Sequence, residues 1–146
     1  MTLSPTLAHW LNHQGFPADQ LDATIHNRTT PLMQAARMGE LSIATELVKL
    51  GADLNATNND GNNALWLACF NGSEPLISLL IQNGSSLNNQ NDNGATCLMY
   101  ASSAGKTSVV AQLLQAGADP RLKSLDDFTA LDVAGNLACL NLLRHT

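Results

Sequence analysis

The sequence predicts an all-α solenoid, in which short helix pairs of similar sequence stack one on the next. The first observation is a leucine that recurs every 33 residues, at Leu32, Leu65, Leu98 and Leu131. The second is an alanine three positions later in each copy, at Ala35, Ala68, Ala101 and Ala134. Two series of glycines keep the same interval: Gly39, Gly72 and Gly105, then Gly51, Gly84 and Gly117. Several registers with one period leave little room for chance and are typical of a stacked repeat protein.

Each copy carries residues that begin and end a helix. A side chain able to cap the first helix occupies the same place throughout, as Thr30, Asn63, Thr96 and Thr129. Pro31 follows at the first helical position, which suits proline, and Gly39 ends that helix. A second helix is expected over about 41–50. Its apolar spacing predicts a buried stripe of Leu41, Ala44, Leu47 and Val48, repeated as Leu76, Ile77, Leu80 and Ile81, then Val109, Val110, Leu113 and Leu114.

These residues carry a family resemblance. The first copy resembles the ankyrin repeat in Thr30-Pro31-Leu32, Ala35-Ala36, Gly39 and Gly51-Ala52-Asp53-Leu54-Asn55. Later copies resemble it in Asp92-Asn93-Gly94-Ala95-Thr96 before Leu98, and in Gly117-Ala118-Asp119. The resemblance covers roughly residues 25–143 and implies helix pairs with hairpin fingers. It also implies binding through the concave face, which consists of the hairpin tips and the outer side of each first helix. It does not name the ligand.

We expect one domain over residues 1–146, with atypical ends. Its parts are an N-terminal helical cap (1–24), full repeats (25–57, 58–90 and 91–123) and a shortened C-terminal capping repeat (124–146). A helix over 4–14, capped by Ser4 and stopped by Gly15, would cover the first repeat, whose apolar face would otherwise be wet. We expect an irregular loop over 16–29. In the last repeat the apolar residues arrive about three positions early, which predicts a shortened helix pair.

Composition excludes several classes of function. The formal net charge is −5, and the chain has no basic stripe, so neither nucleic acid nor an anionic membrane is an expected partner. No run of 18 apolar residues and no signal peptide occur. Cys69, Cys97 and Cys139 lack the spacing of a disulfide framework. We interpret them as reduced, buried thiols of a cytoplasmic protein that is a monomer when free.

Catalytic and metal-binding patterns find no support. His9 and His13 lie one helical turn apart, but no third ligand is evident nearby, so a solvated helix face is the favoured interpretation. The chain contains no Gly-x-Ser-x-Gly, no phosphate loop and no Cys-x-x-Cys. Asp126 and Asp127 form a carboxylate pair without a nearby histidine. We therefore expect no enzyme activity, no catalytic residue, no cofactor and no metal.

Trp66 and Phe70 are the strongest functional signal. They are four residues apart and share a helix face, which we expect to be exposed because Leu65 and Ala68 fill the positions toward the core. Large aromatic side chains on a concave surface are common binding anchors. The predicted partner-binding residues are Trp66, Phe70, Met33, Arg37, Met99, Asn59, Asp60, Asn62, Asp92 and Phe128. Two alternatives remain: the hairpins fold over Trp66 and Phe70, and the hairpin asparagines serve only their own turns.

The sequence therefore predicts a non-enzymatic module that binds a cytosolic protein through its concave face, as an adaptor or inhibitor. A self-associating structural protein would use the same patch between two copies. A small-molecule sensor is a weaker alternative, and it would need a pocket beside Trp66.

Overall fold

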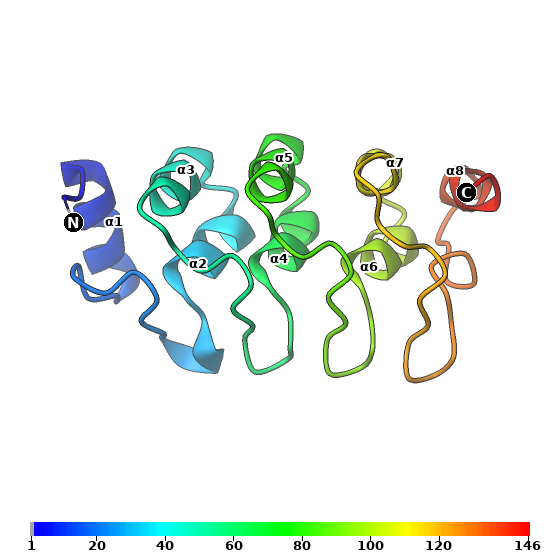
Figure 1. Cartoon of the computed structure of the whole chain (residues 1–146), viewed down its shortest axis with the longest axis horizontal. Helices are drawn as coiled ribbons and strands as arrows, with labels where there is room; N and C mark the ends of the chain where they lie inside the picture. Colours follow the sequence, from blue (N-terminus) through cyan, green and yellow to red (C-terminus); the bar gives the residue numbers. More distant parts are fainter. Residues whose placement is uncertain (1) are drawn as a thin grey trace.

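The computed structural model describes residues 2–146. This part of the chain forms eight α-helices and no β-strand, so the predicted all-α class is confirmed. Figure 1 shows α3, α5, α7 and α8 in one row, α2, α4 and α6 in a second row, and loops beyond the second row. The elements are α1 (Pro5–Gln14), a 3₁₀ turn η1 (His26–Arg28), α2 (Pro31–Met38), α3 (Leu41–Lys49), α4 (Ala64–Asn71), α5 (Glu74–Gln82), α6 (Cys97–Ser103), α7 (Thr107–Gln115) and α8 (Leu137–Arg144).

The predicted caps are present at the first helices of three repeats. The side-chain oxygens of Thr30, Asn63 and Thr96 accept hydrogen bonds from the backbone N–H three residues ahead, at 3.2, 3.0 and 3.1 Å. These bonds satisfy donors that a helix start otherwise leaves without partners. Ser4 caps α1 in the same way, and the left-handed Gly15 ends it. Local chemistry therefore sets the limits of these helices.

The core lies between the two rows of helices. Leu65 and Ala68 are both fully buried, as are their equivalents in the neighbouring repeats. The expected burial of Leu41 is wrong, because its side chain is 40% exposed and Ile43 lies in the core instead. Leu41 is the first residue of α3, and its equivalents Glu74 and Thr107 are polar. The buried stripe of the second helices is therefore Ile43, Ala44, Leu47; Leu76, Ile77, Leu80; and Val109, Val110, Leu113.

Backbone hydrogen bonds join each hairpin tip to the tip before it. The N–H groups of Asn59, Asp92 and Leu125 donate to the carbonyls of Asn27, Asp60 and Asn93 respectively, each at 3.0 Å. Within each turn an asparagine side chain holds the backbone: Asn58 Oδ1 accepts from the N–H groups of Asp60 and Asn62. Asn91 does the same one repeat later. These hydrogen bonds thus fix the position of each hairpin tip relative to the tip before it.

A second series of side chains joins adjacent repeats. Asp22, Asn55 and Asn88 follow the same 33-residue interval, and each offers its Oδ1 to a backbone N–H of the next repeat. The donors are the N–H groups of Asp53, Ser86 and Asp119, at 3.0, 2.9 and 2.8 Å. The abundance of asparagine in the loops therefore has a role between repeats as well as within turns.

The two ends depart from the repeat. At the N-terminus, the backbone N–H of Ser4 donates to Glu46 at 2.8 Å, which ties α1 to α3. Hydrogen bonds from Ser4 hold the pKa of the Glu46 carboxyl below its usual value. In the loop that follows, Asn27 and Arg28 have φ of 60° and 56°, so the expected irregular turn is confirmed.

At the C-terminus the prediction of a shortened helix pair is wrong for the first helix of the pair, which does not form. Residues 130–133 form a turn, residues 134–135 have no regular structure, and only α8 is helical in this repeat. Thr129 and Asp132 bond each other's backbone N–H groups, which closes this segment into one turn. Gly135 then lies against α6, where an added Cβ would be 2.4 Å from the Ser103 carbonyl oxygen. The chain reaches this contact too early for a complete first helix.

Alanine substitutions at two glycines should separate backbone strain from the contact between tips. Gly84 has φ of +96° with open space around it, so we expect Gly84→Ala to cost about 1–2 kcal/mol. Gly94 has φ of +73°, and a Cβ there would be 2.8 Å from the backbone nitrogen of Leu125. Gly94→Ala should therefore lose a further ~1–3 kcal/mol. Urea unfolding measures both; equal losses would contradict a rigid contact between tips.

Candidate functional site

An aromatic cluster joins two of the first helices, α4 and α6. Trp66 and Phe70 from α4 meet Tyr100 from α6. The ring centroids are 6.3 Å apart for Trp66 and Phe70, 4.7 Å for Trp66 and Tyr100, and 6.1 Å for Phe70 and Tyr100. Phe70 is 49% exposed, while the other two rings are partly buried. Trp66 and Phe70 thus share a helix face as predicted. Phe70 is the exposed residue of the pair, whereas Trp66 is partly buried.

Tyr100 was missed by sequence reasoning. Its equivalents in the earlier repeats are Gln34 and the buried Leu67, so the repeat register does not mark this position as aromatic. The usable signal is that Tyr100 follows Trp66 by 34 residues, one repeat and one position. Side chains at such positions come from adjacent first helices, α4 and α6, which pack together.

Lys106 fixes the cluster from the side. Its Nζ donates to the carbonyl oxygen of Phe70 at 2.7 Å and lies 5.8 Å from the centroid of the Tyr100 ring. The carbonyl belongs to the last turn of α4, where a cation is favoured by the helix dipole. The ammonium group also meets the negative face of an aromatic ring. This lysine therefore links two repeats and restrains the rings.

Two open cavities flank Trp66. The first, here named the Arg37 cavity, has a volume of about 330 Å³ and is lined by Arg37, Asp60, Trp66 and Phe70 among others. The second, the Phe128 cavity, has about 300 Å³ and is lined by residues that include Trp66, Tyr100 and Phe128. Trp66 is the residue that the two linings share.

Most of the predicted partner-binding residues meet at these cavities. Arg37, Asp60, Asn62, Trp66 and Phe70 line the first cavity; Trp66, Met99 and Phe128 line the second. Asn59 and Asp92 are exposed at the tips, outside both linings. Phe128 is 51% exposed.

Three of the predicted partner-binding residues are buried, so the exposure expected for them is wrong. Met33 and Met99 are only 1% and 5% exposed. They are the third residues of α2 and α6, and a helical side chain leans toward the start of its helix, which here lies beneath a hairpin. Asn62 is also buried. Its side chain points toward the next hairpin, where its Oδ1 accepts a hydrogen bond from Asn91 Nδ2 at 2.9 Å. Asn62 thus connects two hairpins.

The titratable groups near the cluster do not form a nucleophilic site. Cys69 and Cys97 are both buried, and the hydrogen bond with Cys97 together with burial raises the pKa of the Cys69 thiol. A raised pKa disfavours the reactive thiolate. No set of three His, Cys, Asp or Glu side chains in residues 2–146 is arranged to hold a metal ion. Nor does the described part of the chain contain a helix long and apolar enough to cross a bilayer.

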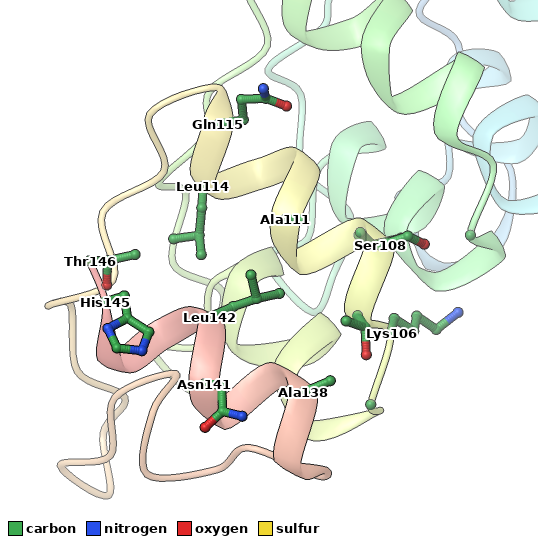
Figure 2. A pocket seen from close by; sticks show the side chains of 14 residues that line it. Lys106, Ser108, Ala111, Leu114, Gln115, Ala138, Asn141, Leu142, His145 and Thr146 are labelled. Atoms are coloured by element: carbon green, nitrogen blue, oxygen red, sulfur yellow. The ribbon is translucent and has the colours of Figure 1, made fainter.

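A larger groove lies away from the predicted residues, between α7 and α8 (Figure 2). Its volume is about 1330 Å³, and Leu114 and Leu142 line its middle. Between α5 and α7 the cavity is smaller, about 210 Å³, and Gln112 donates to Glu74 O and Ser78 Oγ at 2.9 and 2.8 Å. Leu142 takes the place of Gln112 on α8 and has no group to form such bonds, so this junction stays open.

Comparison with known proteins agrees with this geometry. A family model described as "Ankyrin repeats (3 copies)" matches residues 4–91 and 71–146. Neurogenic locus notch homolog protein 1 of Danio rerio is 42% identical over 55 residues, which are 37% of this chain and 2% of that protein. Neurogenic locus notch homolog protein 2 of Homo sapiens is 42% identical over 52 residues, 35% of this chain and again 2% of the relative. The similarity therefore concerns a small segment of each relative.

The environment of Tyr100 should appear in its titration. Burial raises the pKa of the Tyr100 phenol. Because the folded pKa exceeds the unfolded value of about 10, this contribution to stability is complete below that pH and is lost as pH rises through the folded pKa. Tyr100 is the only tyrosine, so ultraviolet absorbance follows it alone. Equal midpoints for the native protein and the urea-unfolded chain would contradict the expectation.

Proposed function

The chain belongs to the ankyrin-repeat family, and we propose that it is a non-enzymatic module that binds a protein partner through its concave face. Proteins of this family are generally protein–protein interaction modules. The single observation that supports the use of this face is the exposure of Phe70 within a restrained aromatic cluster. Burial of an exposed aromatic side chain by a partner contributes a large favourable free energy, because it removes much apolar surface from water.

The aromatic cluster has the composition of a binding hot spot. Binding energy in interfaces concentrates in a few residues, with tryptophan, tyrosine and arginine enriched. Trp66, Tyr100 and Arg37 lie here together, and Lys106 and the core contacts restrain the rings before binding. Restraint in the free protein lowers the entropic cost of association. The partner would then contact Trp66 and Phe70 at the centre and Arg37 with Asp60 at the rim.

We place the module in the cytoplasm, as an adaptor or inhibitor. Its three cysteines, Cys69, Cys97 and Cys139, are free thiols, which suits a reducing compartment. The adaptor and inhibitor roles both require only that the concave face occupy a surface of another protein.

Self-association through the same aromatic cluster is the second candidate function. Leu125 and Phe128 are 76% and 51% exposed near the cluster, which would extend an apolar interface between two copies. Light scattering distinguishes the candidates, because a monomer at high concentration excludes a stable dimer. A small-molecule sensor is less favoured, since the cavities beside Trp66 are at the lower end of the usual range for ligand pockets, about 300–1,000 Å³.

Replacing Phe70 with alanine should abolish capture of the partner. Phe70 is half-exposed, so truncation removes the anchor with little loss of core packing. A hot-spot residue contributes about 2 kcal/mol or more, which corresponds to roughly a 30-fold loss of affinity. We would compare proteins retained from native lysate by wild type and Phe70→Ala, identified by mass spectrometry.

Leu137→Ala is the matched control for this experiment. Leu137 is 68% exposed and lines neither cavity, so its truncation removes apolar surface elsewhere. Circular dichroism would check that both variants fold. The proposal would be wrong if Phe70→Ala retains the same protein as wild type, or if Leu137→Ala loses it equally.

A further inference from the structure

We infer that the segment bound by this face is basic, and that one of its arginine side chains enters the Phe128 cavity. This inference rests on the proposed function and names the chemistry of the partner. It depends on three features of the structure: the aromatic walls of the cavity, the carboxylates on the adjacent hairpin tips and the distribution of the chain's own cations.

The walls of the Phe128 cavity suit a flat cation. Trp66, Tyr100 and Phe128 contribute aromatic rings from three repeats, and no lining residue carries a charge. A guanidinium group stacks on aromatic faces and is more weakly hydrated than an ammonium group, so it enters such a cavity at lower cost. A volume of about 300 Å³ has room for a side chain rather than a large cofactor.

Polar groups in the cavity can accept hydrogen bonds from the segment. Asn93 and Ser103 both line the cavity and are exposed, and within residues 2–146 their side chains form no hydrogen bond. An amide oxygen and a hydroxyl are acceptors for guanidinium or backbone N–H groups. The cavity thus combines aromatic faces with free acceptors.

Two exposed carboxylates lie on the hairpins whose neighbouring residues line the cavity. Asp92 lies between Asn91 and Asn93, which both line it. Asp126 lies between the lining residues Ser124 and Phe128, on the next tip. The backbone hydrogen bonds between tips hold these acidic residues on adjacent hairpins. Opposite charge at an interface favours encounter and excludes partners of the same sign.

The acidic tips are not neutralised by the chain itself. Asp127 pairs with Lys123 at 3.6 Å, but in residues 2–146 neither Asp92 nor Asp126 has a basic side chain within salt-bridge distance. The whole chain adds a net charge of −5, which attracts a basic segment over longer range. These carboxylates are therefore free to meet a cation.

The position of the chain's own cations selects between the two cavities. Arg37 lines the other cavity, together with His26 and Asp60, and its charge would repel an incoming arginine. Lys106 Nζ lies 5.8 Å from the centroid of the Tyr100 ring, but this lysine is not among the residues that line the Phe128 cavity. The Phe128 cavity has no cation among its lining residues, so the arginine is directed there.

The experiment uses the whole protein and a phage-displayed library of random linear peptides. We expect the selected peptides to be enriched in arginine. Synthetic copies of the tightest peptide would then be titrated against wild type and Asp92→Asn/Asp126→Asn, in low and high salt. Exposed charge pairs are individually weak, so the double variant should bind about fivefold more weakly in low salt and show less dependence on salt.

Two controls keep this result specific. Asp19→Asn/Glu40→Gln makes the same change in net charge at exposed or partly exposed acids that form no side-chain hydrogen bond within residues 2–146, so peptide affinity should stay within twofold of wild type. Phe128→Leu keeps an apolar wall but removes the aromatic face, and it should weaken peptides with arginine more than the same peptides with alanine in its place.

Other outcomes overturn the inference and are distinguishable from failure of the proposed function. Peptides without basic enrichment whose binding still requires Phe70 would disprove the arginine and leave protein binding intact. If both charge variants weakened peptide binding equally, the effect would come from the net charge of the protein and not from local contacts with Asp92 and Asp126. An absence of selected peptides, or a dimer that blocks them, would also overturn the inference. The proposed function is tested separately, by comparing the lysate proteins that wild type and Phe70→Ala retain.

Discussion

The hydrogen bond from each hairpin tip to the carbonyl of the preceding tip sets the geometry on which the rest of the structure depends. It fixes one tip directly beside the next, and so fixes the spacing of the first helices that follow each hairpin. Glycine is required at Gly61 and Gly94, because a Cβ at either would come within 3 Å of the adjacent tip. The same spacing brings Trp66 and Tyr100 into contact, although they belong to different repeats.

Contacts between neighbours alone stabilise this kind of stack, and asparagine has a specific part in it. Asn55 and Asn88 each place a short amide where its oxygen reaches a backbone N–H of the next repeat. Glutamine would overreach this distance, and alanine would leave the N–H without its partner. The next position in the series is Arg121, whose guanidinium has no oxygen to offer. The low charge of the chain thus reflects how much of its loop surface is used for backbone hydrogen bonds.

Periodicity predicted the all-α class and the helix caps, because those features depend on local chemistry repeated at a fixed interval. It assigned exposure less well. Met33 and Met99 seemed exposed by analogy with Trp66, but hairpins cover their end of the helix. Tyr100 could not be placed in the cluster, since its partners come from another repeat. The helix lost at 129–135 depends on how Gly135 meets α6, a contact that the one-dimensional pattern does not contain.

The position shared by Met33, Trp66 and Met99 shows where one repeat gives up stability. Methionine is buried at the first and third of these sites. At the second, the Nε1 of Trp66 is buried with no acceptor in residues 2–146, at a cost of about 1–3 kcal/mol. Phe70 on the same helix is half-exposed, so this repeat also leaves apolar surface in water. Trp10 Nε1, Ser85 Oγ and Gln112 Oε1 are also buried without a partner in residues 2–146, so this kind of cost is not confined to Trp66. What distinguishes Trp66 is that its buried N–H lies beside the half-exposed Phe70, and local departures from stability of this kind are expected at a functional surface.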